Sequence, residues 1–116
     1  MPKPGTVFQL EGQDHHIWFV ISKEIAGLVL AVNATDESHC PDSPCKLKPG
    51  DHPRIRKPSA IYYRKAREFE ARKIDREIAS GKFVRQLEDC SLSILERIIA
   101  GAKKADDLTL RFRDYL

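Results

Sequence analysis

The sequence lacks any long run of apolar residues. No stretch approaches the roughly 20 consecutive apolar residues that a membrane-spanning helix needs. The opening residues, 1–5, also lack the apolar core of a secretory signal peptide. We therefore expect a cytoplasmic protein with no membrane partner.

Cysteine is scarce as well. The chain has three cysteines, an odd number that fits no closed disulfide framework and suits a reducing compartment. Internal repeats and low-complexity tracts are absent, so nothing in the pattern divides the chain. At 116 residues, of which 41% are hydrophobic, the sequence fits a single small domain spanning residues 1–116.

The first half of the chain has the features of β-strands. Runs rich in β-branched and aromatic residues occupy 6–10, 16–22 and 28–33, and turn signals separate them. Adjacent runs with short connections favour antiparallel pairing. Proline, serine and aspartate then predict a long loop over 35–49, and a strand resumes near 60–63.

The second half has mainly helical features. Apolar residues recur at helical spacing between 66 and 79 and again over 92–104, and both segments predict helices. Residues 82–87 fit a short strand or a turn. The end of the chain, 106–116, fits either a short helix or a strand.

Strands followed by helices favour an α+β fold. The simplest arrangement is a short, strongly bent antiparallel sheet that closes into a small barrel, with the C-terminal helices packed outside it. On this reading residues 1–66 are mainly β-barrel and residues 67–116 are mainly helical.

Positive charge is concentrated in the middle of the chain. Residues 46–73 contain ten Lys or Arg and three acids, whereas residues 1–45 contain two bases and six acids. Residues 74–116 contain eight of each, so the net charge of +3 conceals one strongly basic segment. Such a segment favours a phosphate-rich partner. The alternative is a solvated basic surface with no partner.

Histidines are candidates for acid–base chemistry in this basic setting. The four are His15, His16, His39 and His52. Two imidazoles can act as base and acid in metal-free RNA cleavage, in which the 2′-hydroxyl attacks the adjacent phosphate. We predict His16, at the start of a strand, and His52, just after a turn, as this pair. The alternative is that these are ordinary histidines of the surface or core.

A hydroxyl and several cations complete the predicted site. Thr35 follows a strand and would either orient a phosphate or cap the turn. Arg54 or Lys57 would stabilise the charge that develops on phosphorus. Consecutive tyrosines on a strand point to opposite faces, so at most one of Tyr62 and Tyr63 joins the site and stacks on a base. The residues predicted to contact RNA are Arg54, Lys57, Ser59, Tyr63 and Arg64.

A zinc site is an alternative use of the same region. His39, Cys40, Cys45 and His52 are four potential ligands close together in the sequence. Structural zinc sites usually have tighter paired spacings, so this spacing is permissible without being diagnostic. Our leading prediction includes no metal and no cofactor.

Three segments together resemble a known family. These are Gly5-Thr6-Val7-Phe8, His16–Ser22 and Leu28–Thr35. Their order resembles the MazF/PemK family of toxins from toxin–antitoxin systems, over roughly residues 4–66. The resemblance implies an SH3-like barrel with added helices, a metal-independent endoribonuclease activity, a homodimer and a cognate antitoxin partner.

The resemblance also assigns individual positions. The catalytic threonine of the family falls on Thr35, which matches. Its catalytic arginine falls on His16, and the proline that follows is replaced by Ile17. The leading hypothesis is thus a divergent toxin that cleaves single-stranded RNA. The alternative is a non-catalytic SH3-like barrel that binds nucleic acid or a protein partner.

Overall fold

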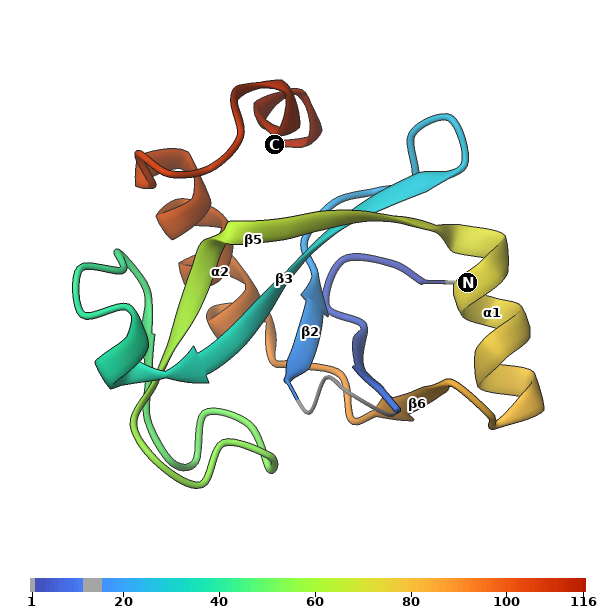
Figure 1. Cartoon of the computed structure of the whole chain (residues 1–116), viewed down its shortest axis with the longest axis horizontal. Helices are drawn as coiled ribbons and strands as arrows, with labels where there is room; N and C mark the ends of the chain where they lie inside the picture. The colour runs from blue at the N-terminus through green and yellow to red at the C-terminus, as the bar shows by residue number, and fades with distance from the viewer. Residues whose placement is uncertain (1, 12–15) are drawn as a thin grey trace.

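Six antiparallel strands form a sheet in the order β4-β5-β3-β2-β1-β6 in the computed structural model, which describes residues 2–11 and 16–116. The strands are β1 (Val7–Leu10), β2 (Ile17–Val20), β3 (Leu28–Asp36), β4 (Lys46–Leu47), β5 (Ser59–Glu70) and β6 (Val84–Leu87). The helices are α1 (Ala71–Ser80) and α2 (Leu92–Lys104), and the 3-10 turns are η1 (Glu37–His39) and η2 (Leu110–Tyr115). The sheet curls into a half-barrel with β4 and β6 at its edges (Figure 1).

The two faces of the sheet carry two separate apolar cores. Successive side chains on a strand point to opposite faces. On β2, Phe19 therefore joins a first core together with Ile98 and Ala102 of α2. Its neighbour Trp18 joins a second core together with Ile74 of α1. Each fully buried large side chain contributes about 1.5–3 kcal/mol to the stability of this arrangement.

The ends of both helices follow from local sequence. The Ser91 side chain accepts a hydrogen bond from the Ile94 N–H and so caps the start of α2, while Lys103 and Lys104 occupy its last turn. α1 ends at Gly81, whose φ of 70° lies in the left-handed region that glycine adopts without strain. α2 thus covers the first core on one face of the sheet, and α1 covers the second core on the other face.

A large bulge in β5 bends the centre of the sheet. Between the pairs Ala31–Arg67 and Asn33–Tyr62, β3 has a single residue, whereas β5 has four, residues 63–66. Extra residues in one strand bend it and redirect their side chains. Figure 1 shows β5 as a long strand that turns sharply before it reaches α1. The bulge thus places its side chains over one end of the sheet.

The structure confirms the α+β class, the first three strands and the helix over 92–104. It also corrects several boundaries. β3 continues to Asp36, so the expected loop begins later and contains η1 and β4. β5 continues to Glu70, because residues 67–70 pair with the start of β3, and α1 therefore begins at Ala71 rather than near 66. Long-range pairing has overridden the local helical pattern there.

The remaining boundary predictions concern the second half. Residues 84–87 form a strand that pairs with β1, and the chain ends in the 3-10 turn η2. A strand is one of the two forms that the sequence predicted for residues 82–87. Within the described residues, no helix has both the length and the apolar character needed to cross a bilayer.

Candidate functional site

A groove lies on the face of the sheet that carries the second core, beyond the part that α1 covers. Its volume is about 680 Å³. The lining residues are His16, Trp18, Asn33, Thr35, His39, Tyr62, Arg64, Lys65, Ala66 and Arg67. Strand register explains this set, because Trp18 pairs with Asn33 and Asn33 pairs with Tyr62. Paired residues share a face, so these three side chains form one row across β2, β3 and β5.

The groove is positively charged. The β5 bulge supplies Arg64 and Lys65, and Arg67 follows directly after it. The Arg67 guanidinium lies 4.6 Å from the ring centre of Phe69 and 5.7 Å from that of Trp18, where the ring faces attract it. None of the lining residues in the described part of the chain is an acid. The groove therefore attracts anions and has no internal carboxylate to neutralise its cations.

Two imidazoles and a hydroxyl lie in the same groove. His16 is exposed, and its Nδ1 lies 3.1 Å from the backbone oxygen of Ala34. A carbonyl oxygen accepts hydrogen bonds, so this contact assigns a proton to Nδ1 of His16. Thr35 Oγ1 lies 3.3 Å from Nδ1 of His39. The groove thus joins His16 and Thr35, as predicted, to a histidine from η1 that the prediction did not use.

The start of η1 is fixed by Asp36. Its carboxylate accepts hydrogen bonds from the backbone N–H and the hydroxyl of Ser38, and it forms an ion pair with Lys57 at 2.9 Å. The backbone hydrogen bond from Ser38, together with Lys57, holds the pKa of the Asp36 carboxyl well below its usual range. This ionised cap holds the turn that presents His39 to the groove.

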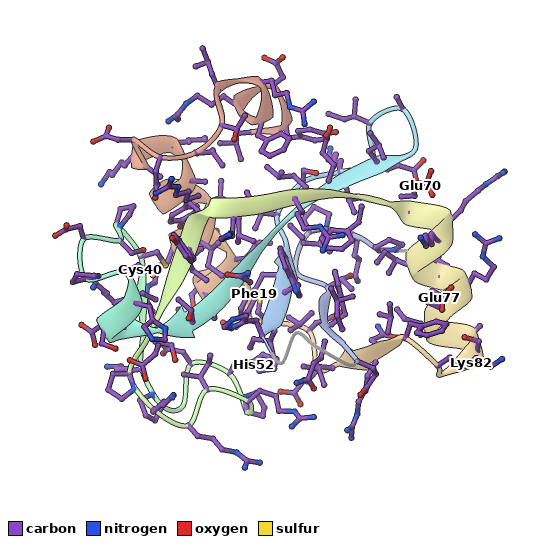
Figure 2. The ribbon with its side chains drawn as sticks, in the orientation of Figure 1. Phe19, Cys40, His52, Glu70, Glu77 and Lys82 are labelled. Carbon is purple, nitrogen blue, oxygen red and sulfur yellow. The ribbon has the colours of Figure 1, made fainter. Side chains whose placement is uncertain are left out.

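His52 does not lie in the groove, which corrects the predicted His16–His52 pair. Its side chain is 2% exposed. Nδ1 accepts a hydrogen bond from the Arg54 N–H at 3.1 Å, and Nε2 lies 2.6 Å from the Glu88 backbone oxygen. The ring packs edge-on against Phe19, with centroids 6.0 Å apart (Figure 2).

The sheet separates the two predicted partners. Phe19, which His52 contacts, belongs to the first core, whereas Trp18 and the groove lie on the opposite face. His16 and Thr35 therefore come together, and His52 is a structural residue of the other face. The turn signal at Gly50–Asp51 correctly predicted a turn, but it does not reveal that the following imidazole is buried.

Four of the five residues predicted to contact RNA, namely Arg54, Lys57, Ser59 and Tyr63, do not line the groove. Lys57 pairs with Asp36, and the Ser59 hydroxyl donates to the Lys57 backbone oxygen. Arg54 supplies its backbone N–H to the buried His52. Arg64 is the predicted residue that does line the groove.

The two tyrosines point to opposite faces, as expected. Tyr62 lines the groove, whereas Tyr63 is 1% exposed and donates its hydroxyl to the Ile98 backbone oxygen at 2.7 Å. Burial raises the pKa of the Tyr63 phenol well above its usual value. Tyr63 is therefore buried away from the groove, contrary to its predicted contact with RNA, and its neighbour Tyr62 is the tyrosine that lines the groove.

The proposed zinc ligands do not form a cluster. Among the described residues, no group of three or more His, Cys, Asp or Glu side chains is arranged to hold a metal ion. Cys45 is buried, and burial raises the pKa of its thiol, which disfavours the thiolate that binds zinc. His15 lies outside the described residues.

A second hollow extends the groove. It has a volume of about 590 Å³ and shares His39, Tyr62 and Arg64 with the groove. It continues along the 40–44 segment to Lys104 at the end of α2, and its lining also includes Asp42, Asp106 and Asp107. The second hollow therefore carries charges of both signs, unlike the groove.

Sequence reasoning did not assign Asn33, Lys65 or Arg67 to the site, and it named His39 only as a candidate histidine and a possible zinc ligand. Asn33 interrupts an apolar run, and Arg67 lies in a segment predicted as helical. The available signal was the alternation of Asn33 and Thr35 on one strand, which places both on the same face.

Searches of protein-family models, curated proteins and solved structures find no match to this chain.

Proposed function

We propose that this protein binds single-stranded RNA along the groove and cleaves it without a metal ion, as a divergent MazF/PemK-like toxin with an SH3-like half-barrel. The observation that carries the proposal is the meeting of two imidazoles, a threonine hydroxyl and three cations on one uncovered face with no lining acid. Phosphate binding needs the cations, and 2′-hydroxyl attack needs an acid–base pair.

The proposed chemistry assigns a role to each imidazole. His16 donates from Nδ1 to the Ala34 backbone oxygen, so its Nε2 carries the lone pair in the neutral ring and takes the proton of the 2′-hydroxyl. The 2′-oxygen attacks phosphorus, and the bond from phosphorus to the 5′-oxygen breaks. His39, as the imidazolium, gives a proton to the leaving 5′-oxygen. The products are a 2′,3′-cyclic phosphate and a 5′-hydroxyl.

The other groove residues hold the phosphate and a base. Thr35 donates its hydroxyl to a non-bridging phosphate oxygen, and Arg64 stabilises the negative charge that develops on it. Tyr62, half-buried in the wall, offers a ring on which an unpaired base stacks. The family resemblance adds a homodimer and a cognate antitoxin to the proposal.

The decisive experiment is incubation of the purified protein with a defined RNA in EDTA. We expect cleavage to leave cyclic phosphate ends, and a substrate with a 2′-deoxy sugar at the cut site should stay intact. His16→Asn and His39→Asn should each slow cleavage by about 10²–10⁴-fold. Arg72→Ala is the matched control, because Arg72 is exposed on α1 and lies outside the groove. Cleavage of the 2′-deoxy substrate, or parental rates in both histidine variants, would contradict the mechanism.

Binding without cleavage is the second candidate. Arg67 is held over Trp18 and Phe69 independently of either imidazole, so the cationic surface is ordered without any catalytic residue. This reading predicts salt-sensitive RNA binding and intact RNA after long incubation.

A further inference from the structure

Asn33 has a buried amide oxygen with no hydrogen-bond partner. The residue is 5% exposed. Among the buried side-chain nitrogen and oxygen atoms of the described residues, its Oδ1 is the one that lacks a partner. Folded proteins pair nearly all such atoms, because an unpaired buried acceptor loses its hydrogen bonds to water without replacement. The exception therefore requires an explanation.

The position of Asn33 suggests a ligand as the missing partner. Its neighbours on β3, Val32 and Ala34, point into the first core, so Asn33 points to the groove face. It lies in register between Trp18 on β2 and Tyr62 on β5. Asn33 is thus part of a groove wall, with an aromatic residue on the strand at each side, and its unpaired oxygen is recessed behind that wall.

The local sequence does not require a polar residue here. β3 is otherwise apolar from Leu28 to Ala34, and an apolar side chain at position 33 would suit the strand without an unpaired acceptor. Asparagine is also a poor strand former. A residue that disfavours the strand and leaves a buried oxygen unpaired is typical of a binding site.

We propose that Asn33 Oδ1 recognises the exocyclic amino group of an unpaired base that stacks on Tyr62. This inference rests on the proposed RNA binding and specifies which bases the groove selects. An amino group projects from the edge of cytosine, adenine or guanine and reaches a recessed acceptor. The ring N–H of uracil is flanked by two carbonyl oxygens, which would approach the amide oxygen and repel it. The groove therefore favours amino-bearing bases over uracil.

The test compares two uncleavable ligands that differ at that group. Short oligomers of 2′-fluoro cytidine and 2′-fluoro uridine have no 2′-hydroxyl, so 2′-attack cannot cut them and the sugar has no hydroxyl to donate. Fluorescence anisotropy in EDTA should show tighter binding of the cytidine oligomer by about tenfold for the parent. Asn33→Leu should reduce the ratio to about twofold or less, whereas Arg72→Ala should keep it.

Two further measurements guard against a folding defect. Asn33→Asp keeps an acceptor, so it should keep the preference for cytidine although its charge weakens binding of both oligomers. Thermal unfolding should show Asn33→Leu to be at least as stable as the parent, because the substitution removes an unpaired buried atom. A large loss of stability in Asn33→Leu would mean that the amide has a structural partner and would overturn the inference.

The outcomes separate this inference from the proposed function. Parental RNA binding with equal affinity for the two oligomers, or an unchanged ratio in Asn33→Leu, overturns the role of Asn33 alone. Binding of 2′-hydroxyl RNA without binding of either 2′-fluoro oligomer shows that the groove recognises the sugar hydroxyl rather than the base edge, which also overturns it. Absence of any RNA binding by the parent overturns both proposals.

Discussion

The imidazole of His52 joins the loop after β4 to the backbone of Glu88, 36 residues away in the chain. Nδ1 accepts from the Arg54 N–H, so the ring proton is on Nε2, which donates to the Glu88 oxygen at 2.6 Å. Both ring nitrogens are thus used, and the ring also packs against Phe19. This arrangement stabilises the fold and leaves no nitrogen for a substrate.

We accordingly expect His52→Ala to lower the free energy of unfolding by about 2–4 kcal/mol, because it leaves a cavity and unpairs two backbone groups. Urea unfolding followed by circular dichroism measures this change. RNA cleavage per folded molecule should stay at the parental level. A variant with parental stability and no cleavage would return His52 to the site.

The parts of the fold that depend on local pattern were predictable. Runs rich in β-branched and aromatic residues predicted the first three strands, and the helical spacing over 92–104 predicted α2. The extension of β5 was not predictable. Residues 67–70 lie within a segment whose apolar residues have helical spacing, and they form a strand because they pair with β3. The bulge at 63–66 has the same origin, since it appears when two distant strands are paired.

The candidate site divides in the same way. His16 and Thr35 lie at the ends of predicted strands, where their positions relative to the sheet follow from alternation. His39 and Arg67 reach the groove through η1 and through the register after the bulge. His52 is also a histidine, and it lies in the basic segment 46–73. The sequence does not show which side of the sheet it packs on, because tertiary contacts set that side for a loop residue.

Arg67 should make a measurable contribution to RNA affinity. Replacing it with alanine removes a cation that lies over Trp18 and Phe69 at the groove. We expect weaker binding and a plot of log affinity against log salt whose slope is smaller in magnitude by about 0.7, as for one lost phosphate contact to a single strand. Anisotropy titrations at several salt concentrations measure this slope.

Arg72→Ala removes the same charge from the exposed surface of α1 and provides the control. Its slope should match that of the parent. Equal slopes for all three proteins would show that Arg67 makes no phosphate contact.

Tyr63 should make stability depend on alkaline pH. Burial keeps its phenol neutral in the folded protein, and its pKa is raised above the ordinary value of 10.0. The unfolded chain releases this proton first as the pH passes 10, so the stabilisation is complete below pH 10 and is lost as the pH rises toward the folded pKa. Between pH 10 and the folded pKa, the parent should lose up to about 1.4 kcal/mol more of its unfolding free energy per pH unit than Tyr63→Phe.

The same variant has a separate effect at neutral pH. Tyr63→Phe removes the donor to the Ile98 oxygen and should cost about 1 kcal/mol. Urea unfolding near pH 7 and above pH 10 gives the free energy of unfolding of each protein. The difference between the parent and Tyr63→Phe at each pH cancels the titration of the remaining groups. Parallel pH dependence in the two proteins would contradict the buried, neutral phenol.

Gly101 allows α2 to approach β5 closely. A Cβ at this position would overlap the Tyr63 hydroxyl and lie 3.0 Å from Cβ of Cys45. Alanine normally stabilises a helix by about 1 kcal/mol relative to glycine. Here we expect Gly101→Ala to lower the free energy of unfolding by about 1–3 kcal/mol, because the buried surroundings must shift.

Two comparisons isolate the steric cause of that loss. Ala100→Gly, at an exposed position in the same helix, measures the intrinsic preference for alanine and should cost about 1 kcal/mol. Gly101→Ala should cost less in a Tyr63→Phe background, because the atom that the new methyl group meets most closely is then absent. Equal costs in the two backgrounds would mean that the hydroxyl of Tyr63 does not limit the approach of the helix, and a gain of stability in the parent background would mean that the two elements are not in close contact.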